Sequence, residues 1–171
     1  MRQANFAMNL LLDSSSAVPY FTDVDATLRA MGVSASEFDW YLSDVETNFD
    51  PAGFSWSDRW MTGPELAEVL SHANFQFIWA VFSAFPRGAR VEIDEAPFAD
   101  GNRAFWVDDG TLRPQLAGAS FELVCWDSSA TILIGISESQ ADQFGLAYPE
   151  AKPLQSVARP GSPPHGETGS A

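Results

Sequence analysis

The sequence predicts an α+β fold, with an antiparallel or mixed sheet of about five or six strands and three helices packed on it. The chain has 171 residues, of which 46% are hydrophobic and 13% aromatic, enough to form one sizeable core. Runs rich in β-branched and aromatic residues outnumber the amphipathic helical segments. Two of these runs, at 75–82 and 130–136, are apolar at odd and even positions alike, which indicates central strands covered on both faces.

The helices are predicted from their start and stop signals. Thr22 is placed to cap DVDATLRAM (23–31), whose apolar residues recur at helical spacing, and Gly32 is placed to end it. Thr62-Gly-Pro-Glu65 has the pattern of a capping box, with its proline in the first turn, where a missing N–H is harmless. A second capping box, Ser137-Glu-Ser-Gln140, predicts a helix that ends before Tyr148-Pro149.

The strands are predicted from runs of apolar, β-branched and aromatic residues. The segment at 38–48 mixes polar and apolar residues, which is typical of an edge strand or a half-exposed one. Ser128-Ser129 separates the last two runs and predicts a hairpin. The predicted strands lie within 5–13, 38–48, 74–84, 90–95, 120–127 and 130–137.

The domain organisation follows from composition. Residues 1–151 are expected to form a single globular α+β domain. The remaining stretch, KPLQSVARPGSPPHGETGSA (152–171), is rich in Pro, Gly and Ser and has little to bury, so it predicts a disordered tail.

The charge of the chain is its most unusual global property. Asp and Glu number 23 against 9 Lys and Arg, which gives a net charge of −14 and a pI of about 4.2. This argues against nucleic-acid binding, which needs a basic surface, and against binding to anionic membranes. Two interpretations remain: a solvated acidic surface that maintains solubility, or an acidic face that matches a basic protein.

A cytoplasmic location is the expectation. No run of 18 apolar residues exists, and the N-terminus, MRQANFAMNLLLD, is a poor secretion signal. The single cysteine, Cys125, lies in the apolar run FELVCW, where a small buried residue that stays reduced is expected.

One string suggests an enzyme. FTDVDATL (21–28) contains Asp-x-Asp-x-Thr, which resembles the nucleophile and acid/base pair of haloacid-dehalogenase-type phosphatases. In that fold the pair follows a buried strand, whereas SSSAVPYF precedes it here, and the only lysine is Lys152. Asp23 and Asp25 are therefore interpreted as residues favoured in the first turn of a helix.

Other catalytic arrangements are equally weak. His72 is the only histidine before the predicted tail, so a Cys125–His72 dyad would be the sole nucleophile–base pair involving histidine. Glu92, Asp94 and Glu95 have the residue types of a paired-carboxylate site, but solvated side chains explain them as well. The sequence therefore predicts no catalytic residue, no metal site and no cofactor.

Two loops with aromatic and acidic residues are the best candidates for a site. They are DPAGFSWSDRW (50–60) and DEAPFADGNRAFWVDDG (94–110), and aromatics rimmed by charge are typical of binding hot spots. The alternative is that these aromatics cover the core beneath the loops. The predicted partner-binding residues are Asp44, Glu46, Trp56, Asp58, Trp60, Asp94, Glu95, Trp106, Asp108 and Asp109.

Six segments carry a resemblance: WYLSDVETNF (40–49), TGPEL (62–66), FQFIWAVFSAFP (75–86), EAPFADGNRAFW (95–106), and above all VCWDSSATILIGIS (124–137), which leads to AYPEAKPL (147–154). Together they resemble a group of small bacterial proteins of unknown function that look like the immunity proteins of polymorphic or contact-dependent toxin systems. The resemblance covers roughly residues 38–154 and involves mostly core and turn residues. It implies an immunity role and transfers no catalytic residue.

The expected function is that of an acidic, non-enzymatic, protein-binding protein. An immunity or inhibitor protein would neutralise a basic partner such as a bacterial toxin through charge complementarity. The alternatives are a small-molecule binding domain or hydrolase with a pocket between the sheet and its loops, and a housekeeping interaction module.

Overall fold

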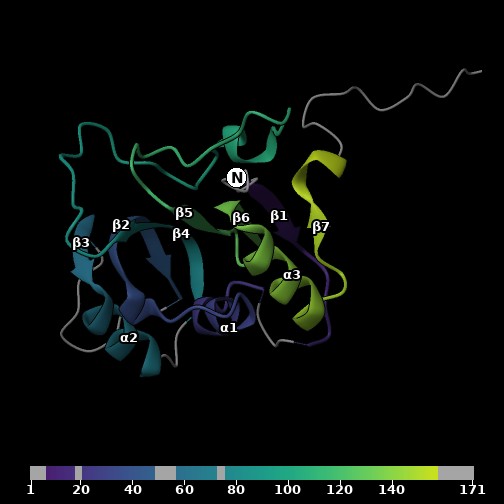
Figure 1. Cartoon of the computed structure of the whole chain (residues 1–171), viewed down its shortest axis with the longest axis horizontal. Coiled ribbons are helices and arrows are strands. Elements are labelled where there is room, and N and C mark those ends of the chain that lie inside the picture. The colour runs from purple at the N-terminus through teal and green to yellow at the C-terminus, as the bar shows by residue number, and fades with distance from the viewer. Residues whose placement is uncertain (1–6, 18–20, 49–56, 73–75, 158–171) are drawn as a thin grey trace, which may run out of the picture.

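A computed structural model describes residues 7–17, 21–48, 57–72 and 76–157, which form three layers (Figure 1). The middle layer is a sheet of seven strands among the described residues, all paired antiparallel, in the order β3-β2-β4-β5-β6-β1-β7. The predicted α+β class is confirmed, and two of the seven strands, both short, were not predicted from the sequence. The strands are β1 (Met8–Leu12), β2 (Phe38–Thr47), β3 (Arg59–Thr62), β4 (Phe77–Pro86), β5 (Phe121–Trp126), β6 (Ala130–Ile136) and β7 (Lys152–Pro153).

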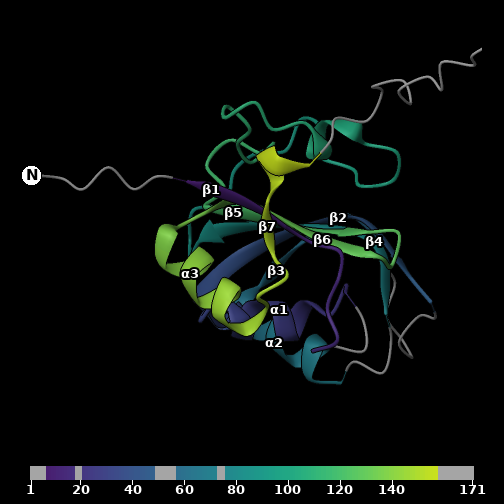
Figure 2. The same ribbon diagram turned by 90° about the vertical axis from the view of Figure 1, so that its right-hand side faces the viewer.

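Three helices, α1 (Val24–Ala30), α2 (Gly63–Ser71) and α3 (Glu138–Ala147), cover one face of the sheet (Figures 1 and 2). Leu66 of α2 and Phe144 of α3 are fully buried there, in the same apolar cluster as Trp40 and Phe82 of the sheet. Burial of each such side chain contributes about 1.5–3 kcal/mol, so this cluster is the main source of stability on the helical side.

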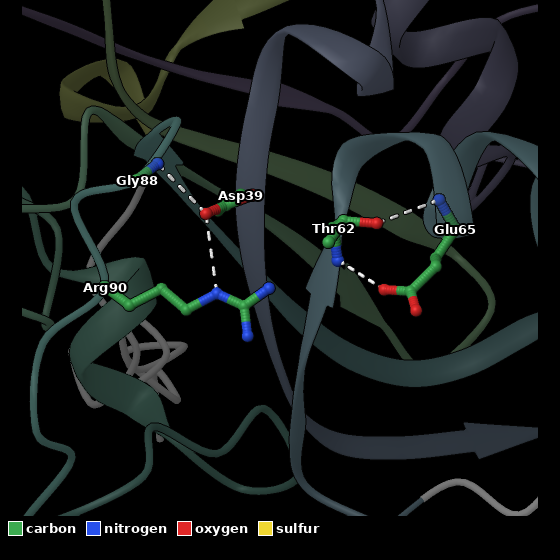
Figure 3. Close-up of polar contacts among 5 residues, drawn as sticks. All are labelled: Asp39, Thr62, Glu65, Gly88 and Arg90. Carbon is green, nitrogen blue, oxygen red and sulfur yellow. Dashed lines mark hydrogen bonds and ion pairs between the residues drawn. The ribbon is translucent and has the colours of Figure 1, made fainter.

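Both predicted capping boxes are present. The Thr62 hydroxyl accepts a hydrogen bond from the Glu65 N–H (3.3 Å), and the Glu65 carboxylate accepts one from the Thr62 N–H (2.7 Å; Figure 3). These bonds lower the pKa of Glu65, because they favour its ionised form. Ser137 and Gln140 make the equivalent pair at the start of α3.

The first helix is capped one residue later than predicted. The Asp23 carboxylate accepts a hydrogen bond from the Ala26 N–H (2.9 Å), so Asp23 and not Thr22 is the N-cap. Thr22 instead donates its hydroxyl to the Phe77 carbonyl at 2.7 Å. Asp25 lies in the first turn and pairs with Arg29. This arrangement explains the Asp-x-Asp string as helix capping and dipole complementarity.

The third layer is the connection between β4 and β5, residues 87–120, which crosses the face opposite the helices (Figures 1 and 2). It contains a short 3-10 helix, η2 (Arg103–Trp106), and it lies on the same side as η3 (Leu154–Ser156). Ala99 and Phe105 of the connection and Leu154 of η3 are buried in one cluster with Val81 and Val124 of the sheet. The sheet is therefore covered on both faces, as the apolar runs indicated.

Carboxylates of the sheet hold this connection in place. The Asp39 carboxylate of β2 accepts hydrogen bonds from the Gly88 N–H (3.1 Å) and the Arg90 Nε–H (3.4 Å; Figure 3). The Glu122 carboxyl of β5 accepts one from the Leu116 N–H at 3.1 Å. A segment without regular structure thus satisfies part of its backbone from the sheet beneath it.

The structure corrects several expectations. Residues 90–95 form no strand, and β2 is an inner strand instead of an edge strand. The partial exposure predicted for β2 applies only to its second half, because residues 39–43 are buried. The sequence did not indicate β3 or β7, which are the two edges. Lys152 and Pro153, expected in the tail, pair with β1, and Leu154 after them is buried, while residues 158–171 lie outside the described residues.

No helix in the described ranges combines the length and apolar character needed to cross a bilayer.

Candidate protein-binding surface

Asp44 interrupts the regular pairing of β2. The register between β2 and β4 shifts between Ser43 and Glu46, and Asp44 has a φ of 50°, in the left-handed region that aspartate tolerates better than most residues. Its carboxylate accepts hydrogen bonds from the N–H groups of Ala99 (2.7 Å) and Asp100 (2.9 Å). The bulge therefore brings the end of β2 and the β4–β5 connection together.

Four acidic residues meet at this end of the sheet, and we call them the acidic corner: Asp44, Glu46, Asp58 and Asp100. The Asp58 carboxylate accepts a hydrogen bond from the Asp44 N–H at 3.0 Å, and Asp100 follows Ala99 on the connection. Glu46, Asp58 and Asp100 are exposed. Burial raises the pKa of the Tyr41 hydroxyl, and the negative charge of Asp58 adds to this rise.

Three tryptophans lie beside the acidic corner, and we call them the tryptophan cluster: Trp79, Trp106 and Trp126. The Trp79 and Trp126 rings meet edge to face with centroids 5.0 Å apart, and those of Trp106 and Trp126 do so at 5.3 Å. All three are half-buried. Trp79 is the cross-strand partner of Glu46, so the cluster is continuous with the corner.

The sequence identified only part of this surface. Asp44, Glu46, Asp58 and Trp106 are predicted site residues that the structure places here. Trp79 and Trp126 were not predicted, because they lie in apolar runs interpreted as buried strands. Only their position near strand ends would have signalled partial exposure.

The other predicted residues lie elsewhere or are engaged in the fold. Trp60 packs edge to face against Tyr41 and Phe85 and lies under Arg90, so it has a structural role. Asp94 and Glu95 are exposed on the connection. Trp56 lies outside the described residues.

Asp108 and Asp109 stabilise a turn in the connection. Asp108 accepts hydrogen bonds from the Asn9 amide and the Gly110 N–H, both at 2.8 Å, and thereby ties the turn to β1. Asp109 accepts one from the Thr111 N–H at 2.9 Å. Both carboxylates thus contribute to the fold at a site that contacts β1, an outer part of the sheet away from β2.

Two cavities are lined by residues that the structure describes. A cavity of about 330 Å³ is lined by Ala7, Phe38, Ser120, Phe121, Gly135, Ile136, Ser137 and Gln140, none of which is an acid or a base. Ser137 and Gln140 are already bonded to each other's backbone in the capping box. A smaller cavity, of about 160 Å³, contains Asp108 and Arg113, but Asp108 is bonded to Asn9.

The groups considered for catalysis are placed unfavourably. Cys125 is fully buried, and burial raises the pKa of its thiol, which opposes formation of a thiolate nucleophile. His72 is exposed at the end of α2. Within the described ranges, no group of three or more His, Cys, Asp or Glu side chains has the geometry to hold a metal ion.

Glu122 is the most buried carboxyl group described. It is completely inaccessible on β5, and burial raises its pKa in spite of hydrogen bonds from the backbone of Gln115 and Leu116 and from the Ser83 hydroxyl. Its second oxygen has no partner among the described residues. A substrate could reach Glu122 only if the connection above it moved away. We therefore interpret Glu122 as a structural residue that holds the connection on the sheet through its hydrogen bonds.

No protein-family model, curated protein or solved structure was found to match this chain. The resemblance to immunity proteins therefore stays a prediction.

Proposed function

We propose that this protein binds a basic protein partner through the acidic corner and acts as an inhibitor, in the manner of an immunity protein that neutralises a toxin. The observation that supports this most is the joining of the corner to the tryptophan cluster. Carboxylates from β2, from the residue before β3 and from the distant β4–β5 connection converge beside three half-buried aromatic rings. Aromatic anchors with a polar rim are the usual composition of a binding hot spot.

The electrostatics of the chain support a basic partner. Clustered carboxylates repel one another, and this cost is offset when a partner supplies positive charge. With a net charge of −14, the whole molecule would also speed the approach of a basic protein. The proposal places the protein in the cytoplasm, where the buried Cys125 would stay reduced.

The alternative, a small-molecule binding domain or hydrolase, has less support. A ligand site usually combines an apolar pocket with a few convergent polar groups. The larger cavity has no acid or base in its lining, and the carboxyl of the smaller one serves the fold.

The test is affinity capture of the tagged protein from its native host, with elution in rising salt and identification of the recovered proteins by mass spectrometry. Glu46→Lys/Asp100→Lys changes two exposed residues of the corner. Glu68→Lys/Asp142→Lys makes the same charge change on exposed positions of α2 and α3, on the other side of the sheet. We expect a basic partner to be recovered with the wild type and the helical variant and lost with the corner variant. Recovery of no basic protein from cells that express the neighbouring genes would contradict the proposal.

A further inference from the structure

We infer that the tryptophan cluster, together with Glu46, forms a binding site for an arginine side chain of the partner. This inference rests on the proposed function and deepens it, because it names the group that the partner would present. The proposed occupant is a guanidinium that lies against the Trp79 ring and pairs with the Glu46 carboxylate.

The sheet places the two required groups next to each other. Glu46 on β2 and Trp79 on β4 are cross-strand partners at the bulge, where the register shifts on both sides of Glu46, and Glu46 is exposed. Cross-strand partners lie close enough for their side chains to contact one bound group. Trp126 packs against Trp79 from β5, and Trp106 packs against Trp126 from η2, so the Trp79 ring is held in position.

Elsewhere in the chain, a tryptophan and a carboxylate already bind an arginine side chain. At the other end of β2, the guanidinium carbon of Arg90 lies 5.4 Å from the centre of the Trp60 ring, and Arg90 Nε is 3.4 Å from the Asp39 carboxylate. A carboxylate on β2 and a tryptophan on a neighbouring strand thus hold an arginine between them. In the described part of the chain, no Arg or Lys is paired with Glu46 or placed over Trp79.

The geometry favours arginine over other occupants. Trp79 and Trp106 each meet Trp126 at a steep angle, 74° and 84°, so neither pair of contacting rings forms a parallel stack. Single ring faces beside a carboxylate suit a cation, and arginine stacks on aromatic faces while it bonds to carboxylates, which lysine does less well. Asp127, the exposed residue after Trp126, adds negative charge and excludes anionic groups.

The probe is a blocked tetra-arginine peptide titrated into the full chain, with tetra-lysine of equal charge as the comparison. The indole N–H signals report on each tryptophan by NMR. We expect saturable shifts at Trp79, Trp106 and Trp126, with weaker binding of tetra-lysine. Glu46→Gln is expected to weaken tetra-arginine binding by about 3- to 10-fold, whereas Glu68→Gln on α2 removes the same charge and leaves it unchanged.

Trp79→Leu keeps apolar bulk and removes the ring, so it should weaken binding to a similar degree. If Trp79→Leu does not fold, the Glu46→Gln result alone tests the inference. Shifts confined to other indoles, or equal losses for Glu46→Gln and Glu68→Gln, would overturn the inference. A recovered protein partner that binds Trp79→Leu as tightly as wild type would overturn it too, while the proposed function stands. Peptide binding at the cluster without any basic partner from cells would support the site and contradict the proposed function.

Discussion

The Arg90 Nε lies 3.4 Å from Asp39 Oδ2, and this contact fixes the start of the connection that crosses the sheet (Figure 3). Asp39 also accepts the Gly88 N–H, and Arg90 lies over the Trp60 ring. Asp39 is almost buried, with a side chain 11% exposed, whereas that of Arg90 is 42% exposed. The two partners therefore contribute unequally to stability.

Asp39→Ala is expected to destabilise the protein by about 1.5–3 kcal/mol, because a buried charged acceptor of two hydrogen bonds is lost. Arg90→Ala should cost about 1 kcal/mol or less, because its charge is largely solvated and Asp39 keeps the Gly88 bond. Urea unfolding of the two single variants measures the difference in their free energies of unfolding. The double variant then gives the coupling energy between Asp39 and Arg90. Equal losses for the two single variants would show that the ion pair, and not the backbone bond, holds the loop.

Glu122→Gln is expected to remove a pH dependence of stability. The folded pKa of Glu122 is raised by burial, so the folded protein keeps a proton that the unfolded chain releases at about pH 4.3. The contribution of Glu122 to the free energy of unfolding therefore falls as the pH rises from about 4.3 through its folded pKa. The variant does not titrate, so its stability relative to wild type should increase over this range.

Urea unfolding at a series of pH values from acidic to mildly alkaline tests this. Glu68→Gln, at an exposed position, is the control and should follow the wild-type pH profile. A constant difference between Glu122→Gln and wild type at every pH would mean that Glu122 does not have a raised pKa.

Gly63→Ala is expected to destabilise the start of α2. A Cβ at Gly63 would lie 2.5 Å from the carbonyl oxygens of Ala35 and Phe38, which are backbone atoms that cannot rotate away. Overpacking of this kind costs about 1–3 kcal/mol. At Gly145 in α3 nothing lies within 4 Å of an added Cβ, so Gly145→Ala should stabilise the protein, by about 0.5–1 kcal/mol. Thermal unfolding measures both variants. If both substitutions raised the melting temperature, or both lowered it, the packing argument would be refuted.

Cys125 is expected to resist thiol reagents in the folded protein. The side chain is fully buried, and burial raises the pKa of its thiol, so access and thiolate formation are both suppressed. Labelling with a disulfide reagent should be slow under native conditions and rapid in concentrated urea. Fast labelling of the native protein would mean that the sheet opens near β5 far more often than its burial indicates.

The sequence predicted those parts of the fold that depend on local chemistry. The Thr62–Glu65 and Ser137–Gln140 capping boxes are recognisable because each bond forms within one turn. The strands β4 and β6 were also recognisable. Both of their faces are covered, so their sequences are continuous apolar runs.

The failures depend on contacts between distant segments. Residues 90–95 alternate like a strand, yet β4 is already paired with β2 and β5, and Ile93 packs on the sheet face beside Tyr41 and Phe85. The alternation therefore reflects a loop with one apolar side.

The acidic corner was partly predicted from composition. Its link to Trp79 depends on a register shift at Asp44 that no local pattern signals.

The most direct test of the proposed function is the affinity of the recovered basic partner for the two double variants, measured at two salt concentrations. The proposal predicts that Glu46→Lys/Asp100→Lys weakens binding by about tenfold or more and reduces its salt dependence, while Glu68→Lys/Asp142→Lys leaves both close to wild type. Equal weakening by both variants would mean that only the overall negative charge attracts the partner. That result would contradict a binding surface at the acidic corner.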